Sequence, residues 1–261
     1  MNELPSLKLP VPEVTVGAYR AVFGRLGAVL ELGWLPLLLL LAVSILPAAL
    51  PPDFGAKNPV LRALPDFLDL VAGALCLNAF GVRWYQAQLL GGGSARRPWL
   101  APWARFLAYT FVLYLALGLM LTGALFLAMA ANGRGVAAEI VMGALDLAGA
   151  VGLLLAMARL AMLFPAAAVG RPIGLAGTWH ATRGNGWRIV LCWLFSTAPL
   201  LLGVQMIMGA VFTGFRIGAH APMGLYLLRG LVGTVADFLI AALGAAVLSD
   251  IYRRLVQALE S

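Results

Sequence analysis

Residues 106–133 read FLAYTFVLYLALGLMLTGALFLAMAANG and contain no charged side chain. An α-helix needs about 20 consecutive apolar residues to cross the roughly 30 Å of hydrocarbon in a lipid bilayer. A helix also satisfies its own backbone hydrogen bonds, which lipid cannot do. This stretch therefore predicts a transmembrane helix.

The composition of the whole chain agrees with this interpretation. Of the 261 residues, 62% are hydrophobic and 11% are charged, whereas a soluble domain has roughly 45–50% apolar and about 25% charged residues. A compact soluble domain needs a polar exterior that this composition cannot supply. The composition thus excludes a soluble globular enzyme, a disordered chain and a disulfide scaffold. It predicts an all-α, polytopic membrane protein.

The apolar pattern predicts six transmembrane helices in a single membrane domain at residues 13–261, preceded by a cytoplasmic tail at residues 1–12. We expect the spans at about 28–50, 64–90, 104–131, 139–169, 188–215 and 225–252. Each is long enough to cross a bilayer.

Two short amphipathic helices are expected at the membrane surface. Between Glu13 and Gly27, apolar residues recur at steps of three and four, with Arg20 and Arg25 between them, a spacing typical of an interfacial helix. The second is expected between the fourth and fifth spans, where Leu175 and Trp179 would share one helix face.

The basic residues predict the orientation. Twelve arginines and lysines fall on the side of both termini, five fall on the opposite side, and Arg159 lies within a span. Because cytoplasmic loops carry the excess of basic residues, both termini are expected in the cytoplasm. The net charge of +7 is explained in the same way, so no nucleic-acid partner is predicted.

The loop after the fourth span is the most patterned part of the chain. Its arginines and tryptophans would reach the headgroup level, and each basic residue near an anionic surface contributes about 1 kcal/mol. We therefore expect the lipid bilayer, and anionic phospholipids in particular, to be the partner of this loop, through Arg171, Trp179, Arg183, Trp187 and Arg188.

This loop follows the segment RLAMLFP at residues 159–165, and together they carry a family resemblance. Over about residues 159–190 the chain resembles the group of bacterial inner-membrane proteins formed by YciC-like proteins and the membrane domains of glycerophosphoryl diester phosphodiesterases. Elsewhere the similarity is one of topology. The resemblance implies a six-helix membrane domain in a bacterial inner membrane. The resemblance covers the membrane domain only, so we do not expect it to imply phosphodiesterase activity.

The sequence predicts no catalytic residue, no cofactor-binding residue and no metal ligand. The two histidines, His180 and His220, are expected on opposite sides of the bilayer, and no Cys/His spacing suits zinc. The glycine run at 91–93 lacks the lysine and the preceding strand of a phosphate-binding loop. A membrane-embedded enzyme is disfavoured but left open.

Charged side chains at membrane depth need a partner, because each costs roughly 2.5–3.5 kcal/mol at a helix centre. Asp237 lies near the middle of the sixth span and Arg159 on the inner half of the fourth. We expect the two to form an ion pair between these helices. Asp146 and Gln205 are the other polar residues at membrane depth.

Two functions follow from these features. The first is a non-enzymatic inner-membrane protein that binds lipid at its cytoplasmic face and serves membrane organisation or envelope maintenance. The alternative is a small-molecule or ion transporter that uses Asp237 and Arg159. The shortage of polar residues in the first, third and fifth spans favours the first function.

Overall fold

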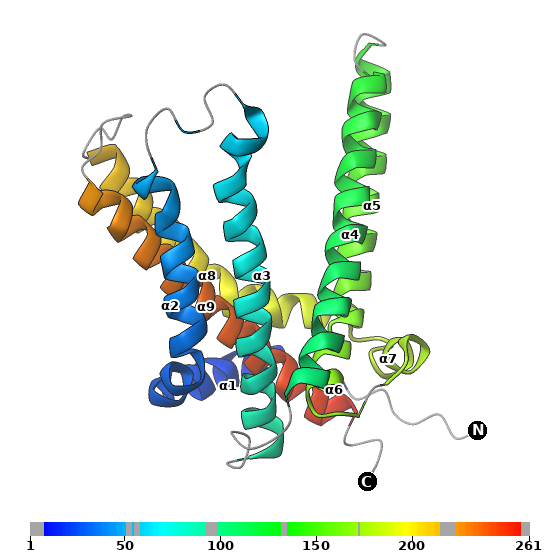
Figure 1. Cartoon of the computed structure of the whole chain (residues 1–261). Helices are drawn as coiled ribbons and strands as arrows, with labels where there is room; N and C mark the ends of the chain where they lie inside the picture. Colours follow the sequence, from blue (N-terminus) through cyan, green and yellow to red (C-terminus); the bar gives the residue numbers. More distant parts are fainter. Residues whose placement is uncertain are drawn as a thin grey trace, which may run out of the picture.

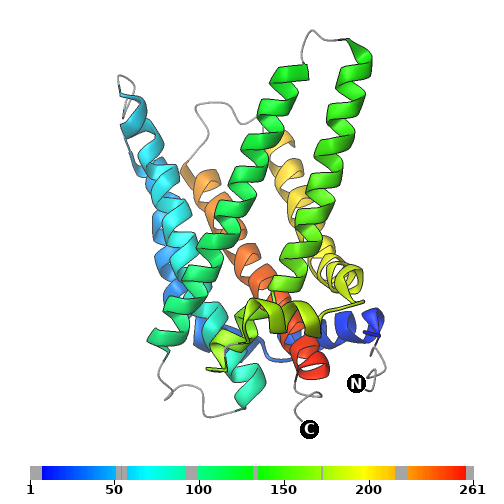
Figure 2. The same ribbon diagram turned by 90° about the vertical axis from the view of Figure 1, so that its right-hand side faces the viewer.

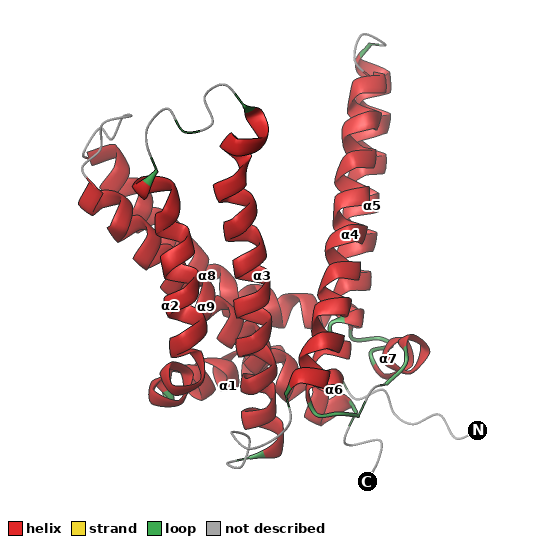
Figure 3. Cartoon of the chain, in the orientation of Figure 1, coloured by secondary structure: helices red, strands yellow, loops and turns green. Residues whose placement is uncertain are grey.

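The fold is seen in a computed structural model of the chain, which describes residues 8–50, 54, 58–91, 99–131, 135–171, 173–214 and 223–256. Within these ranges all regular secondary structure is α-helical, as predicted (Figure 3). The helices are α1 (Val11–Phe23), α2 (Leu26–Ala49), α3 (Pro59–Leu90), α4 (Leu100–Ala131), α5 (Val136–Leu160), α6 (Leu163–Ala168), α7 (Leu175–Ala181), α8 (Gly186–Gly214) and α9 (Met223–Leu255).

Five segments are long and apolar enough to cross a membrane, and they lie in α2, in α4, over α5 and α6, in α8 and in α9. The prediction of a membrane protein is supported to this extent. The segment expected as the second span forms α3 but is not among the five. Its apolar sequence is interrupted by Asp66, Asp69 and Asn78.

The fourth expected span is broken near its end. We predicted one helix over 139–169, but α5 ends at Leu160 and α6 begins at Leu163. Pro165 has no N–H to donate to the carbonyl of Ala161, and its ring would clash with that carbonyl in a continuous helix. Instead, the amide of Phe164 donates to the Ala161 carbonyl at 3.2 Å in a tighter turn. After the break, α6 packs against α3, α4 and α9, and five of its six residues are buried.

The helices form two groups, a bundle around α9 and a hairpin of α4 and α5. α9 packs against α1, α2, α3, α6 and α8, and α2 also packs against α3. The antiparallel hairpin of α4 and α5 (green in Figure 1) stands beside this bundle and reaches it through α3, α6 and α8. α1 and the C-terminal end of α9 lie at the same end of the molecule, near α6 and α7 (Figures 1 and 2).

The core of the bundle is built on close contact between α2, α3 and α9. The ring of Phe80 lies 5.2 Å from that of Phe238, centroid to centroid, and both side chains are buried. A Cβ atom placed on Gly33 would come within 3.2 Å of both rings. Glycine at this position therefore allows α2 to approach α3 and α9.

The N-terminal helix differs in detail from the prediction. α1 ends at Phe23 rather than continuing to Gly27. Val14, Ala18 and Val22 are buried against the bundle, while Val16 is 54% exposed. The apolar residues of α1 thus cover two faces, one against protein and one open.

Candidate functional site

The segment before α1 is held by two residues at the start of α8. The amide of Leu9 donates to Asn185 Oδ1 at 3.1 Å, and Arg188 Nη1 donates to the Leu9 carbonyl at 2.8 Å. Leu9 itself is fully buried. We expected residues 1–12 to form a tail outside the membrane domain, but Leu9 is part of the packed structure, and residues 1–7 lie outside the described ranges.

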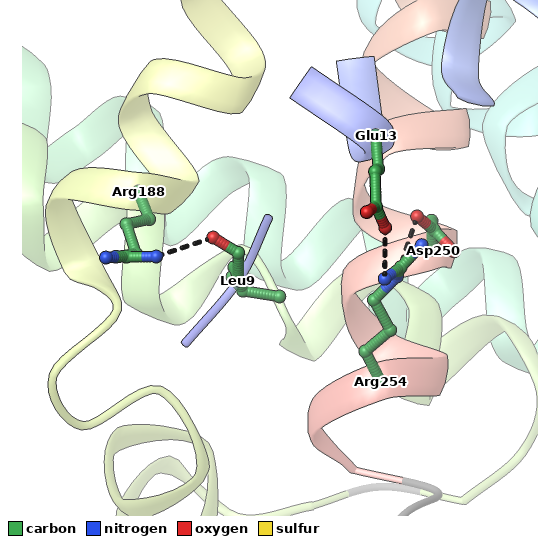
Figure 4. A network of polar contacts seen from close by, with 5 residues as sticks. All are labelled: Leu9, Glu13, Arg188, Asp250 and Arg254. Atoms are coloured by element: carbon green, nitrogen blue, oxygen red, sulfur yellow. Dashed lines mark hydrogen bonds and ion pairs between the residues drawn. The ribbon is translucent and has the colours of Figure 1, made fainter. Parts of the chain in front are cut away.

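Side-chain contacts then fasten α1 to α8 and α9. The Tyr19 hydroxyl donates to the Ser196 carbonyl at 2.8 Å, and burial raises the pKa of this phenol, so it keeps its proton at neutral pH. Arg254 lies 3.1 Å from Asp250 on its own helix and 3.4 Å from Glu13 of α1 (Figure 4). These contacts fix how α1 lies across the ends of α8 and α9.

A pocket of about 590 Å³ opens beside these contacts. Such a volume falls within the roughly 300–1,000 Å³ typical of small-molecule sites. α1 and α9 supply most of its wall and α3 supplies one residue. The polar and charged lining residues are Glu13, Arg20, Gln88, Ser249, Asp250, Arg253 and Arg254.

The pocket keeps more basic charge than acidic charge. Three arginines and two carboxylates line it, which leaves one excess positive charge. Arg254 is paired with both carboxylates. Arg253 Nη2 donates to the Gln88 carbonyl, a neutral group. Within the described ranges, neither Arg20 nor Arg253 forms an ion pair, so the pocket is suited to an anion.

Four of the five residues predicted to bind lipid are exposed, and the fifth, Arg188, has a different contact. Trp179 is 48% exposed and Trp187 is 53% exposed, and Arg171 and Arg183 are exposed as well. Arg188 instead donates a hydrogen bond to the Leu9 carbonyl. It therefore holds the segment before α1, a contact that the sequence did not predict.

Arg159 and Asp237 are not brought together. The guanidinium of Arg159 lies over the Trp179 ring, 4.4 Å from its centroid, and its Nε is 3.1 Å from where a Cβ of Gly186 would be. The physical reason is the packing order, since α5 packs on α8 and α8 packs on α9. Within the described residues no ion pair joins Arg159 to Asp237.

The other residues expected at membrane depth are placed as follows. Asp237 is exposed on α9, Gln205 is exposed on α8, and Asp146 is half-buried on α5. Among the described residues there is no group of three or more His, Cys, Asp or Glu side chains that could hold a metal ion.

Of the polar pocket residues, the sequence pointed only to Arg20, as part of an interfacial helix, although a signal for others was present. Glu13 and Arg20 are seven residues apart on α1, and Ser249 and Arg253 are four apart on α9. Both spacings place two polar side chains on one helix face. What the sequence could not show is that these two faces meet.

Comparison of the chain with protein-family models, with curated proteins and with solved structures finds no match. The site must therefore be interpreted from its own geometry.

Proposed function

We propose that the chain is an integral membrane protein with six spans, formed by α2, α3, α4, the α5–α6 segment, α8 and α9. Five of these segments are apolar enough to cross a bilayer. The sixth, α3, packs against α2 and α9 and returns the chain to the end from which α4 starts (Figure 1). With Arg20 of α1, Arg183 after α7, and Arg253 and Arg254 of α9 at that end, both termini are cytoplasmic.

We further propose that the protein is not an enzyme and binds anionic phospholipids at its cytoplasmic face, in the service of membrane organisation or envelope maintenance. The observation that carries this proposal is the exposure of Trp179 and Trp187 beside the exposed Arg183, all close to the turn between α7 and α8. Tryptophan favours the interface between lipid and water, and arginine favours anionic headgroups.

The resemblance to the YciC-like group belongs to the same proposal. It rests on residues 159–190, which form the end of α5, the buried α6, the helix α7 and the start of α8. A six-span inner-membrane protein of a bacterium is what that group implies.

The test of lipid binding is the substitution Arg183→Gln. Loss of one basic residue at an anionic surface costs about 1 kcal/mol, or about fivefold in binding. We expect the variant to co-purify with less phosphatidylglycerol, relative to phosphatidylethanolamine, when lipids are extracted from purified protein and counted by mass spectrometry.

The matched control is Arg62→Gln, an exposed arginine in the first turn of α3, and α3 begins at the end of the molecule opposite to α7 (Figure 1). It should leave the lipid ratio unchanged. Added salt should weaken the phosphatidylglycerol enrichment of the unmodified protein, because exposed charges are screened. Equal lipid ratios for the Arg183 variant and the unmodified protein would contradict the proposal.

A further inference from the structure

The pocket between α1 and α9 contains a buried hydroxyl with no partner. Ser249 is 2% exposed, its Oγ has no hydrogen-bond partner, and it lines the pocket. Buried polar groups are nearly always hydrogen-bonded, and one that is not calls for an explanation. Less than 1 Å² of this Oγ is accessible, so a ligand oxygen in the pocket would accept its hydrogen bond once the Ser249 side chain rotates toward the pocket.

The charges beside Ser249 indicate what kind of ligand that is. Arg20 and Arg253 line the same pocket, and their two positive charges exceed the single negative charge left after Arg254 pairs with Glu13 and Asp250. Guanidinium groups bind phosphate oxygens through charge-assisted hydrogen bonds, often two at a time. Two arginines and one hydroxyl are therefore a suitable donor set for a phosphate group.

The remaining wall of the pocket is apolar. Val16, Gly17, Ala21 and Ala246 line it, and Val16 is 54% exposed. A wholly polar ion would leave this wall in contact with water. A phospholipid joins a phosphate to glycerol and acyl chains, so it suits both parts of the pocket.

We propose that this pocket binds one anionic phospholipid, with the phosphate held between Arg20 and Arg253 and accepting a hydrogen bond from Ser249. This goes beyond the lipid binding proposed for the α7–α8 turn, since it uses different residues on different helices. It rests only on the part of that proposal that places this end of the bundle at the membrane surface.

Gly17 offers a test that separates binding from folding. A Cβ at this position would meet no atom within 4 Å, and Gly17 lies inside α1 and lines the pocket. Gly17→Leu should therefore fill the pocket without disturbing the packed face of α1, and it should improve the helix propensity of α1. Its matched control is Gly27→Leu in α2, which also meets no atom within 4 Å and does not line the pocket.

The experiment is a titration of the detergent-solubilised full chain with dioleoyl phosphatidylglycerol, followed by native mass spectrometry, which resolves the first bound lipid from later ones. Gly17→Leu should lose the first, tight binding event while its thermal unfolding midpoint stays equal or rises. Arg20→Gln with Arg253→Gln should weaken that event about 25-fold, from about fivefold for each arginine. Gly27→Leu and Arg25→Gln should stay within twofold of the unmodified protein.

Three outcomes would overturn the inference. The first is tight binding of the first lipid in both Gly17→Leu and the double arginine variant. The second is equal affinity for zwitterionic dioleoyl phosphatidylcholine. The third is displacement of the lipid by inorganic phosphate at equal concentration, which would assign the site to free phosphate.

The Arg183→Gln variant, titrated in parallel, distinguishes the two proposals. It should weaken only the later, weaker binding events. If Arg183→Gln reduces lipid binding and the pocket variants do not, the function proposed for the α7–α8 turn stands and the pocket inference fails. If only the pocket variants reduce binding, the reverse holds.

Discussion

α9 and the α4–α5 hairpin are similarly apolar, yet they are packed in opposite ways. In the most apolar window of α9, 56% of the residues are buried inside the protein, whereas none is buried in the corresponding windows of α4 and of the α5–α6 segment. On α4, Phe111 is 68% exposed, while Phe238 of α9 is 4% exposed. Apolarity alone therefore does not tell which helix faces protein.

The difference follows from the environment of a membrane helix. Lipid tails are as apolar as leucine, so hydrophobicity favours insertion but does not drive helices together. Close packing needs small residues that let backbones approach, as Gly33 does between Phe80 and Phe238. A further contribution comes from polar pairs such as Ser44 and Thr234, whose hydroxyls lie 3.3 Å apart.

A matched pair of phenylalanine substitutions tests most directly whether the bundle is packed more tightly than the hairpin. Phe80 is fully buried in the bundle, stacks on Trp84 and makes a tilted contact with Phe238. Phe80→Ala should lower the free energy of unfolding by about 3 kcal/mol, because it leaves a cavity. Phe111→Ala on the exposed face of α4 should change it by less than about 0.5 kcal/mol.

Both values can be measured by unfolding the protein with SDS in mixed micelles. Similar losses for Phe80→Ala and Phe111→Ala would mean that the hairpin is packed as tightly as the bundle. The distinction between the two regions would then be wrong.

A second comparison concerns hydrogen bonds in the two regions. Asn185→Ala removes the buried acceptor of the Leu9 amide and should cost about 1–3 kcal/mol, because the amide is left without a partner. Thr122→Ala removes an exposed hydroxyl that donates to the Gly118 carbonyl within α4 and should cost less than about 0.5 kcal/mol.

Limited proteolysis gives a second measurement of the Asn185 contact. The N-terminal segment should be cleaved faster in Asn185→Ala than in the unmodified protein, because Leu9 is no longer held. Cleavage at an unchanged rate would show that Arg188 alone holds the segment.

The smallest expected effect tests the contact at the base of the hairpin. A double-mutant cycle with Arg159→Gln and Trp179→Leu should give a coupling energy of about 0.5–1 kcal/mol, the usual range for a cation over an aromatic ring. The same cycle with Asp237→Asn in place of the tryptophan change should give a coupling near zero, because distant sites act independently. A larger coupling to Asp237 than to Trp179 would restore the ion pair expected from the sequence.

Much of the architecture could be predicted from the sequence. Long apolar stretches placed the helices to within a few residues, as with the third expected span at 104–131 and α4 at Leu100–Ala131. Backbone hydrogen bonding in lipid leaves an apolar stretch of that length few other structures. The structure differs from the prediction at two places. Pro165 interrupts the fourth expected span, and Asp66 makes α3 less apolar than the other spans.

The candidate sites depended on tertiary structure, because they join residues far apart in the chain. Arg159 and Asp237 looked like partners on the basis of their depth in two helices, but depth does not specify which helices are neighbours. α8 lies between α5 and α9, so Arg159 meets Trp179 instead. In the same way, the pocket forms because α1 packs across α9 and brings Glu13 and Arg20 beside Asp250 and Arg253. The amino-acid sequence was sufficient to predict which segments are helical and apolar. Which polar side chains meet depended on the packing of those helices, because side-chain contacts are set by the rotation and order of the helices and not by their composition.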